Sequence, residues 1–385
     1  MNVILTNDVG QFFIDFFQNT GIAAFFTGSW KNLIMILIAL LLLYLAIFKK
    51  AEPYLLIPIG IGCLLSNIPG SEIFHSDGGN STGLFDLMYK GLGLYPCLIF
   101  IGIGATTDFG PLISNPKTMI LGAAAQIGIF VTFILAIACG FTPQQASSIG
   151  IIGGADGPTA ILTTKTLAPE LLSSIAIAAY SYMALVPFIQ PPVIRLLTTK
   201  KERRIHMEET KPVSKTKKIL FPIIVTVVVT LIVPSCAPLI GCLMLGNLFK
   251  ECGVVPKLAE TAGNALLYIV TILLGLTVGA TATAENFLSI ETLKIFGLGI
   301  LAFILATAGG VLIGKIMCYA THGKVNPMIG AAGVSAVPMA ARVVQKEAQR
   351  EDPSNFLLMQ AMGPNVAGVI GSAVAAGLLI QLFGV

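Results

Sequence analysis

Long apolar stretches, separated by short polar or glycine-rich breaks, fill the chain from Trp30 onward. A membrane-spanning helix needs about 20 predominantly apolar residues, and many of these stretches approach that length. The pattern therefore predicts about ten transmembrane helices. The predicted spans are Trp30–Phe48, Pro53–Ile68, Leu84–Gly104, Thr118–Gly140, Leu171–Leu197, Ile219–Val233, Cys236–Phe249, Ala262–Ala284, Leu293–Tyr319 and Phe356–Phe383.

One further apolar stretch is interrupted by glycines around a single acid. Residues 149–160 read Ile-Gly-Ile-Ile-Gly-Gly-Ala-Asp-Gly-Pro-Thr-Ala, and Asp156 is the only acid between Asp108 and Glu170. Glycine and proline break a helix, and irregular backbone at membrane depth is tolerated only where protein or a water-filled cavity satisfies it. We therefore expect a re-entrant broken-helix hairpin over 142–166. Asp156 either serves a cation there or caps the second half-helix.

A second copy of this stretch follows at a separation of 180 residues, from Gly150 to Gly330. The matching pairs are Ile149 and Ile329, Gly150 and Gly330, Gly153 and Gly333, Pro158 and Pro338, and Ala160 and Ala340. Asp156 falls opposite Ala336, and the same register pairs Asn67 with Asn247. Paired breaks in two halves are typical of transporters with inverted repeats. A chance match of small residues is the alternative.

The basic residues predict the orientation of the chain. The most basic loop, 198–218, should be cytoplasmic by the positive-inside rule, where it either only fixes orientation or docks a soluble partner. The loops with Lys49 and Lys117 fall on the same side if the hairpins 142–166 and 326–346 enter from opposite sides.

The predicted fold is thus an all-α polytopic membrane protein with an inverted-topology repeat. Residues 30–197 form the first repeat, 198–218 a cytoplasmic linker and 219–385 the second repeat. Residues 1–29 contain phenylalanines spaced three to four residues apart. They form either an amphipathic interfacial segment or a core-packed helix.

Composition places the whole chain in one class. Of 385 residues, 55% are hydrophobic and 11% are charged, which excludes a soluble domain of this size. The net charge of +4 lies mainly in loops and does not indicate nucleic-acid binding. The seven cysteines are scattered without a metal-binding spacing, which indicates buried, reduced thiols. No basic region precedes an apolar one at the N-terminus, so no cleaved signal peptide is expected.

Polar residues inside the apolar stretches are the candidates for chemistry. An ionised acid at membrane depth costs about 2.5–3.5 kcal/mol, and oxygen ligands suit a hard cation such as Na⁺, so Asp156 comes first. Ser335, beside the second break, is placed to complete an oxygen cage. Asn326, which precedes Pro327, either contributes or caps a helix. Arg342 either snorkels inward or faces an anion, and its planar fork suits a carboxylate.

Two spans carry further polar groups. Tyr180 and Tyr182 lie about half a turn apart, so they face different sides of their helix. In the last span Gly363-Pro-Asn365 and Gly371-Ser372 interrupt the helix. Asn365 either is a ligand or satisfies the kinked backbone.

Three motifs resemble one family. Residues 150–159 (Gly-Ile-Ile-Gly-Gly-Ala-Asp-Gly-Pro-Thr), 179–187 (Ala-Tyr-Ser-Tyr-Met-Ala-Leu-Val-Pro) and 362–372 (Met-Gly-Pro-Asn-Val-Ala-Gly-Val-Ile-Gly-Ser) together resemble the membrane β subunit of sodium-pumping biotin-dependent decarboxylases. That family includes the oxaloacetate, methylmalonyl-CoA, glutaconyl-CoA and malonate enzymes. The resemblance extends from about Trp30 to the C-terminus.

The resemblance implies that carboxybiotin, presented by a partner, is decarboxylated while Na⁺ leaves the cytoplasm across the bacterial inner membrane and a proton is consumed. It implies catalytic positions at Asp156, Tyr182 and Arg342, with carboxybiotin held by Arg342. The implied Na⁺ positions are Asp156, Asn326, Gly330 and Ser335, and the secondary candidates are Tyr180, Asn365 and Ser372. The implied partners are a carboxyltransferase subunit, a biotin-carrier protein or domain and a small membrane γ/δ-type subunit, in a homo-oligomer within the lipid bilayer.

Two other classes of function compete with this one. A secondary Na⁺/carboxylate symporter without chemistry fits the composition and the repeat equally well, and only the resemblance around Asp156 disfavours it. A membrane scaffold for a soluble enzyme would not need an acid at a broken helix. The chain contains no Met-Lys-Met biotinylation site, so we expect both the biotin and the choice of acyl substrate to lie on a partner.

Overall fold

The computed structural model of the chain is almost entirely helical, which confirms the predicted all-α class. The one exception in the described part is a short antiparallel ribbon of β1 (Ser76–Asp77) and β2 (Ser81–Thr82). The structure describes residues 11–12, 16–17, 20–26, 30–50, 52–71, 76–77, 81–335 and 338–384. Most of the segment 1–29, for which an interfacial helix was predicted, therefore lies outside the described residues.

The helices of the first half follow the predicted spans closely. They are α2 (Gly21–Phe26), α3 (Trp30–Phe48), α4 (Pro53–Ser66), α5 (Leu84–Lys90), η1 (Gly91–Gly93), α6 (Tyr95–Thr106), α7 (Gly110–Ser114), η2 (Pro116–Thr118), α8 (Met119–Ala125), α9 (Ile127–Ala138), α10 (Pro143–Gly150), η3 (Ile151–Gly154), α11 (Gly157–Leu167), η4 (Pro169–Leu171) and α12 (Leu172–Leu197).

The second half contains the remaining helices. They are α13 (Lys200–Arg203), α14 (Lys215–Ile232), η5 (Pro234–Cys236), α15 (Ala237–Cys252), α16 (Pro256–Thr261), η6 (Ala262–Leu266), α17 (Leu267–Thr281), α18 (Ala284–Phe287), α19 (Ile290–Ala320), η7 (Pro327–Gly333), α20 (Met339–Glu351) and α21 (Leu358–Phe383).

A helix lies at each of the ten predicted span positions. Among the described residues, five helices are long and apolar enough to cross a membrane, or up to seven if each of two bent pairs forms one span. The other three positions hold α4, α15 and α14, which have 14, 16 and 18 residues. The chain is thus a multi-pass membrane protein, and ten crossings remain the prediction.

Helix α3 shows why these helices require a lipid environment. It buries Met35, Ala39 and Leu42 on one face, at the three- to four-residue spacing of a helical stripe. The other face leaves Leu37 58% and Phe48 71% exposed. Continuous exposed apolar surface of this kind marks contact with a membrane or a partner.

The described helices group into two compact units. Unit 1 comprises Met1–Leu92 and Ile272–Thr292, and unit 2 comprises Gly93–Thr271 and Leu293–Val385. Each unit therefore combines helices from both predicted repeats. The division into repeats 30–197 and 219–385 remains a prediction.

Both units contain a closely packed helix pair of the same construction. In unit 1, a Cβ added to Gly62 of α4 would overlap the Leu276 carbonyl of α17, and one added to Gly279 would overlap the Ile59 carbonyl. Only glycine permits such an approach of two helices.

In unit 2, Gly104 of α6 and Gly246 of α15 face each other's backbones in the same way. Asn67 donates its amide to the Ala282 carbonyl just after α17, and Asn247 donates to the Thr107 carbonyl just after α6. The two asparagines paired by the 180-residue register thus each bind the carbonyl that follows the partner helix.

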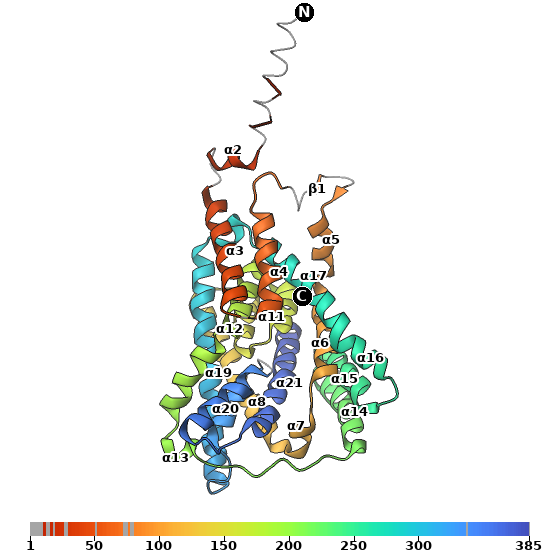
Figure 1. Ribbon diagram of the computed structural model, residues 1–385, viewed down its shortest axis with the longest axis vertical. Coiled ribbons are helices and arrows are strands. Elements are labelled where there is room, and N and C mark those ends of the chain that lie inside the picture. The colour runs from red at the N-terminus through yellow and green to blue at the C-terminus, as the bar shows by residue number, and fades with distance from the viewer. Residues whose placement is uncertain are drawn as a thin grey trace, which may run out of the picture. The chain divides into compact units, whose positions relative to one another are not determined.

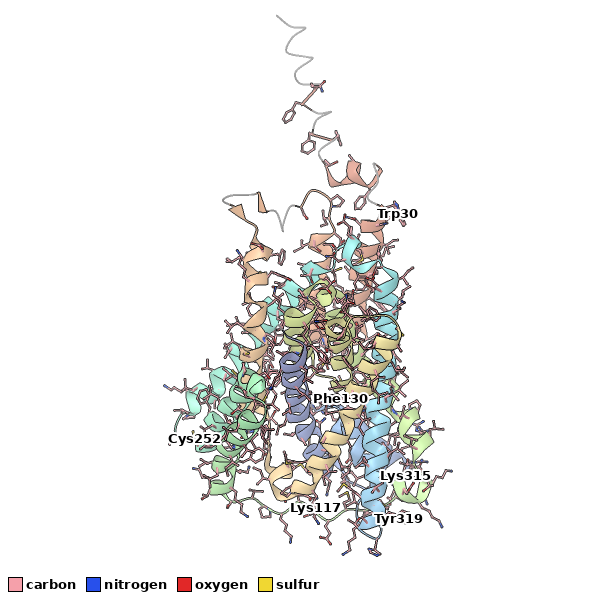
Figure 2. All side chains as sticks on the ribbon, turned by 180° about the vertical axis from the view of Figure 1, so that it is seen from behind. Trp30, Lys117, Phe130, Cys252, Lys315 and Tyr319 are labelled. Atoms are coloured by element: carbon pink, nitrogen blue, oxygen red, sulfur yellow. The ribbon has the colours of Figure 1, made fainter. Side chains whose placement is uncertain are left out.

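Helix α21 runs through the middle of unit 2 and contacts both legs of each hairpin (Figure 1). The first hairpin consists of α10, η3 and α11, and the second of η7 and α20. Lys117, Lys315 and Tyr319 lie toward one end of unit 2, as Figure 2 shows. Lys315 also donates to the Leu197 carbonyl, where the linker begins, so the Lys117 loop and the basic linker lie on the same side of this unit, as predicted.

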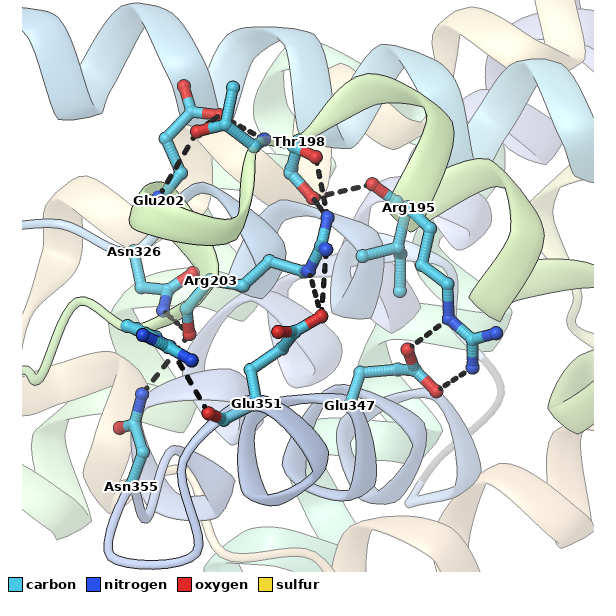
Figure 3. A network of polar contacts seen from close by, with 11 residues as sticks. Arg195, Thr198, Glu202, Arg203, Asn326, Glu347, Glu351 and Asn355 are labelled. Carbon is cyan, nitrogen blue, oxygen red and sulfur yellow. Dashed lines mark hydrogen bonds and ion pairs between the residues drawn. The ribbon is translucent and has the colours of Figure 1, made fainter.

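The first part of the linker is fixed against α20 (Figure 3). Arg203 of the linker binds Glu351 through Nε and Nη2 at 3.0 and 2.7 Å. Just before the linker, Arg195 of α12 binds Glu347 through two nitrogens at 2.6 and 2.5 Å. Paired guanidinium–carboxylate contacts of this kind fix orientation as well as distance. The linker thus positions the second leg of the second hairpin.

Candidate functional site

The first hairpin has the broken-helix form that the sequence predicts. Thr142 and Gln145 form a capping box at the start of α10, and the chain tightens into η3. At Ala155 the backbone enters the left-handed region, with φ 55°, and Asp156 is extended before α11 begins. The reversal thus falls on an alanine directly before the acid, although glycines surround it.

Asp156 is buried, with 7% of its surface exposed, and is surrounded by hydroxyl groups. Its Oδ2 accepts hydrogen bonds from Thr159 Oγ1 at 2.5 Å and from Ser372 Oγ at 3.0 Å. Although Asp156 occupies the N-cap position of α11, its side chain makes no capping bond to the backbone. The positive end of the α11 dipole favours an anion at this position, and cation binding by Asp156 remains a prediction.

The second hairpin meets the first at its tip. The backbone N–H of Ser335 donates to the Gly154 carbonyl at 3.1 Å, so the two hairpins are in contact. The Ser335 hydroxyl is buried and has no hydrogen-bond partner among the described residues. Ser335, in the second hairpin, is thus hydrogen-bonded to the first hairpin two residues before Asp156.

Buried amides fasten the second hairpin. Asn365 on α21 donates to the Ala332 and Val334 carbonyls at 2.8 and 2.9 Å, and Gln190 donates to the Ala331 carbonyl at 3.0 Å. The Asn365 amide therefore satisfies irregular backbone of the second hairpin rather than the kinked backbone of its own helix, and a ligand role for Asn365 remains a prediction. Its Oδ1 has no partner in the described part of the chain.

Gly330 allows a close approach of the second hairpin to α19. A Cβ at Gly330 would overlap the Gly310 carbonyl, and a Cβ at Gly310 would overlap the Gly330 carbonyl. The position accepts only glycine for this packing reason, and a Na⁺ role for its backbone remains a prediction.

Asn326 caps the start of η7. Its Oδ1 accepts from the Met328 N–H at 3.0 Å, and its amide donates to the Arg203 and Ile205 carbonyls of the linker at 3.2 and 2.9 Å. Its polar groups are therefore used within the chain, as the capping alternative requires. Ligation of Na⁺ by Asn326 remains a prediction.

Arg342 is exposed on the first turn of α20. Among the residues that the structure describes, its guanidinium makes no ion pair and no side-chain hydrogen bond. This contrasts with Arg195 and Arg203, whose guanidinium groups bind glutamates. Arg342 is therefore available to a carboxylate from outside the chain.

The two tyrosines of α12 face different sides, as predicted. The Tyr180 ring lies against Gly157, where a Cβ would overlap it, and so borders the residue after Asp156. Tyr182 donates its hydroxyl to the Phe296 carbonyl of α19 at 2.5 Å. The structure thus places Tyr180 beside the break and Tyr182 against a neighbouring helix.

Two residues near the break were not singled out from the sequence. Thr159 lies within the motif of residues 150–159. It follows Asp156 by three residues at the start of a helix, and this spacing could have predicted the contact between their side chains. Gln126 is buried between α8 and α9. A polar residue in the middle of the apolar span Thr118–Gly140 was the available signal.

Comparison with known proteins identifies relatives along the whole chain. A family model described as Na⁺-transporting oxaloacetate decarboxylase beta subunit matches residues 31–383. Methylmalonyl-CoA decarboxylase subunit beta of Propionigenium modestum is 57% identical over 396 residues, which cover 97% of this chain and 100% of that protein.

Relatives named for other acyl substrates are almost as similar. Glutaconyl-CoA decarboxylase subunit beta of Acidaminococcus fermentans is 54% identical over 95% of this chain and 96% of that protein. Oxaloacetate decarboxylase beta chain of Klebsiella pneumoniae is 50% identical over 90% of this chain and 94% of that protein. These names favour a decarboxylase subunit over the symporter.

Proposed function

Because the chain belongs to the family of β subunits of Na⁺-transporting decarboxylases, we propose that its two hairpins form the site where Na⁺ binds and carboxybiotin is decarboxylated. The chain is a subunit of a multi-subunit decarboxylase in a membrane. The carboxybiotin substrate, the export of Na⁺ across the bacterial inner membrane and the roles of individual residues are our proposal.

The observation that carries the proposal is the backbone hydrogen bond from Ser335 to Gly154, which joins the two hairpins two residues before the buried Asp156. A cation bound there would contact both hairpins, so its presence would change how the two tips meet. Asp156 supplies the charge, and the hydroxyls of Ser335 and Ser372 supply neutral oxygens suited to Na⁺. Asn326 and Gly330 would act through the shape of the second hairpin.

The reaction requires one proton for each CO₂ released. The bond between the carboxyl carbon and the ureido nitrogen of carboxybiotin breaks, CO₂ leaves, and the nitrogen takes up the proton. Arg342 would bind the carboxylate before this step, and Tyr182 would exchange a proton with the site after its hydrogen bond to Phe296 opens. Moving one charge against 100 mV costs about 2.3 kcal/mol, so chemistry must be coupled to bound Na⁺.

A cavity of about 540 Å³ on the linker side of unit 2 is the proposed port for the carboxybiotin head group. His206, Lys211 and Lys324 line it and suit a carboxylate, while Glu208 and Glu209 also contribute to its wall. The biotin carrier would approach from this side, next to the basic linker.

The other subunits would supply what this chain lacks. Relatives named for three different acyl substrates are about equally similar to it, so we place acyl recognition on a carboxyltransferase subunit. Biotin would be carried by a separate protein or domain, and a small membrane γ/δ-type subunit and further copies of this chain would complete the complex.

The test is an Asp156→Asn substitution in the purified complex. It preserves the shape and removes the charge, so decarboxylation of the carboxylated carrier and Na⁺ uptake into vesicles should both fall by at least a hundredfold, while the subunits still assemble. The matched control is Asp108→Asn, because Asp108 is half-exposed and its one ion pair in the described part of the chain is with Lys218 at 3.5 Å, while its Oδ1 also accepts from the Gly110 N–H. Such surface pairs contribute little. Wild-type turnover in Asp156→Asn would exclude the site.

A further inference from the structure

Gln126 lies where α8 ends and α9 begins, and its side chain is directed to α21. Its Nε2 donates to the Gly122 carbonyl at 3.0 Å and to the Gly368 carbonyl of α21 at 3.4 Å. A Cβ built on Gly371 would lie 3.0 Å from Nε2. The amide thus packs along the same turns of α21 that carry Ser372, one of the two hydroxyl donors to Asp156.

The other end of this amide faces the first hairpin. A Cβ built on Gly154 would lie 3.6 Å from Gln126 Oε1 and 3.0 Å from the Ser372 Cβ. Gly154 is the residue whose carbonyl accepts from Ser335. Oε1 therefore lies where the two hairpins meet, next to Gly154, which precedes Asp156 by two residues.

This oxygen has no partner although it is buried. Gln126 is 5% exposed, and Oε1 accepts no hydrogen bond from any described residue. A buried acceptor without a partner destabilises the fold, and a bound cation would offset this cost. The Ser335 hydroxyl, where the two hairpins meet, is also without a partner among the described residues.

We propose that Gln126 contributes its side-chain oxygen as a ligand of the transported cation. The proposal rests on the Na⁺ site proposed at Asp156 and adds a ligand from the junction of α8 and α9, outside both hairpins and α21. Its Nε2 bonds to Gly122 and Gly368 fix the amide orientation, so that only Oε1 can face the site. A neutral oxygen adds affinity for Na⁺ without adding charge.

Two substitutions separate a ligand from a structural support. Gln126→Met keeps the size and removes both the oxygen and the N–H donors, whereas Gln126→Glu keeps an oxygen at the site and removes the donors. If Oε1 is a ligand, Gln126→Met should raise the Na⁺ concentration for half-maximal activity at least tenfold, and Gln126→Glu, which keeps an oxygen but loses the bonds that orient it, should raise it less than Gln126→Met does. If the amide only ties α8 to α21, both variants should be impaired equally, which would overturn the proposal.

Na⁺-dependent thermal stabilisation of the purified complex gives a readout besides activity. The Gln126→Met complex should lose most of this Na⁺-dependent stabilisation. Gln190→Met is the matched control, because Gln190 also donates to a hairpin carbonyl and has an unpartnered buried oxygen; it should retain the shift. An Asp156→Asn complex that is still stabilised by Na⁺ would overturn the proposed site. If the Na⁺-dependent stabilisation is lost in Asp156→Asn but retained in Gln126→Met, only the role of Gln126 is overturned.

Discussion

At the scale of single residues, the central fact is a buried carboxylate without a basic partner. Asp156 receives hydrogen bonds only from Thr159 and Ser372 among the described side chains. The two buried glutamate contacts of α20, by contrast, each involve an arginine. An unpaired charge in a low-dielectric interior is costly. We therefore propose a mobile cation as the counter-ion of Asp156, and an external anion as the partner of Arg342, which makes no ion pair in the described part of the chain.

Substitution of Arg342 by lysine tests this second role. Lysine keeps the charge but loses the planar pair of donors that matches a carboxylate. The apparent KM for the carboxylated carrier should rise about tenfold, in line with the loss of one charged hydrogen bond, while the half-maximal Na⁺ concentration should change less than twofold. Steady-state decarboxylation at several concentrations of carrier and Na⁺ measures both.

Arg350→Lys provides the control for Arg342→Lys. Arg350 is exposed near the end of the same helix and should tolerate the change in both parameters. Equal damage by Arg342→Lys to carrier and Na⁺ dependence would indicate a structural role for Arg342.

The sequence predicted some of these residues and not others for physical reasons. An acid among glycines and prolines is conspicuous, so Asp156 was found, and Ser335 and Ser372 adjoin similar breaks. Gln126 interrupts an otherwise ordinary apolar span, and its importance depends on which turn of α21 it meets. The register of distant helices decides that contact, and local pattern carries no information about it.

At the scale of elements, three ion pairs tie α20 and the residue after it to the end of α12 and to the linker. Arg195–Glu347 and Arg203–Glu351 are followed by His206–Asp352, in which Nε2 and Oδ2 are 2.9 Å apart. The sequence predicted a basic linker that fixes orientation or docks a partner. The structure adds that its first part fastens the hairpin leg that carries Arg342.

The last of these contacts gives a pH-dependent prediction. Hydrogen bonds from Ser354 and His206 lower the pKa of Asp352 to about 2, below the usual value of about 3.9. The stabilisation from this carboxylate is therefore present above about pH 3.9 and is lost as the pH falls through about 2. Thermal unfolding of the purified complex should become less pH-dependent between pH 4 and 2 in Asp352→Asn than in wild type.

Glu209→Gln serves as the control for Asp352→Asn. Glu209 is an exposed acid of the same linker region, without an ion pair in the described part of the chain. Its replacement should leave the acid limb of the wild-type curve unchanged. Parallel curves for wild type and Asp352→Asn would mean that Asp352 is not specifically stabilised.

Element boundaries were predictable where composition changes abruptly. The span Trp30–Phe48 coincides with α3, and Leu171–Leu197 differs from α12 by one residue. The interior of α12 was less predictable. Pro169–Met183, which joins η4 to the first part of α12, and Leu185–Leu197 are bent by 64° relative to each other, because Pro187 removes the hydrogen bond to the Met183 carbonyl and its ring clashes there. The sequence gives the position of a kink but not its angle.

At the scale of the whole molecule, we propose that the chain is an inverted repeat, and the paired helices support this. In unit 1, Gly62 and Gly279 bring α4 and α17 together, and in unit 2, Gly246 and Gly104 do the same for α15 and α6. Asn67 and Asn247 then bind the carbonyl that follows the partner helix. If α4 is equivalent to α15, each pair takes one helix from each half of the chain, as two intertwined repeats require.

Substitution of one close-contact glycine in each pair tests whether the two pairs share one packing arrangement. In the 180-residue register Gly62 falls opposite Cys242 and Gly246 opposite Ser66, so the two glycines are not register partners. A Cβ at Gly62 or Gly246 would overlap a backbone carbonyl that has no room to move, so Gly62→Ala and Gly246→Ala should each lower the stability of the complex by about 1–3 kcal/mol, the usual cost of overpacking. Gly241→Ala is the control, because a Cβ there meets no atom within 4 Å; it should be neutral or stabilise α15 by up to about 1 kcal/mol. Melting temperatures of the purified complexes measure all three. Tolerance of one glycine substitution and severe damage from the other would mean that the two pairs are not equivalent, because two copies of one packing arrangement must respond alike.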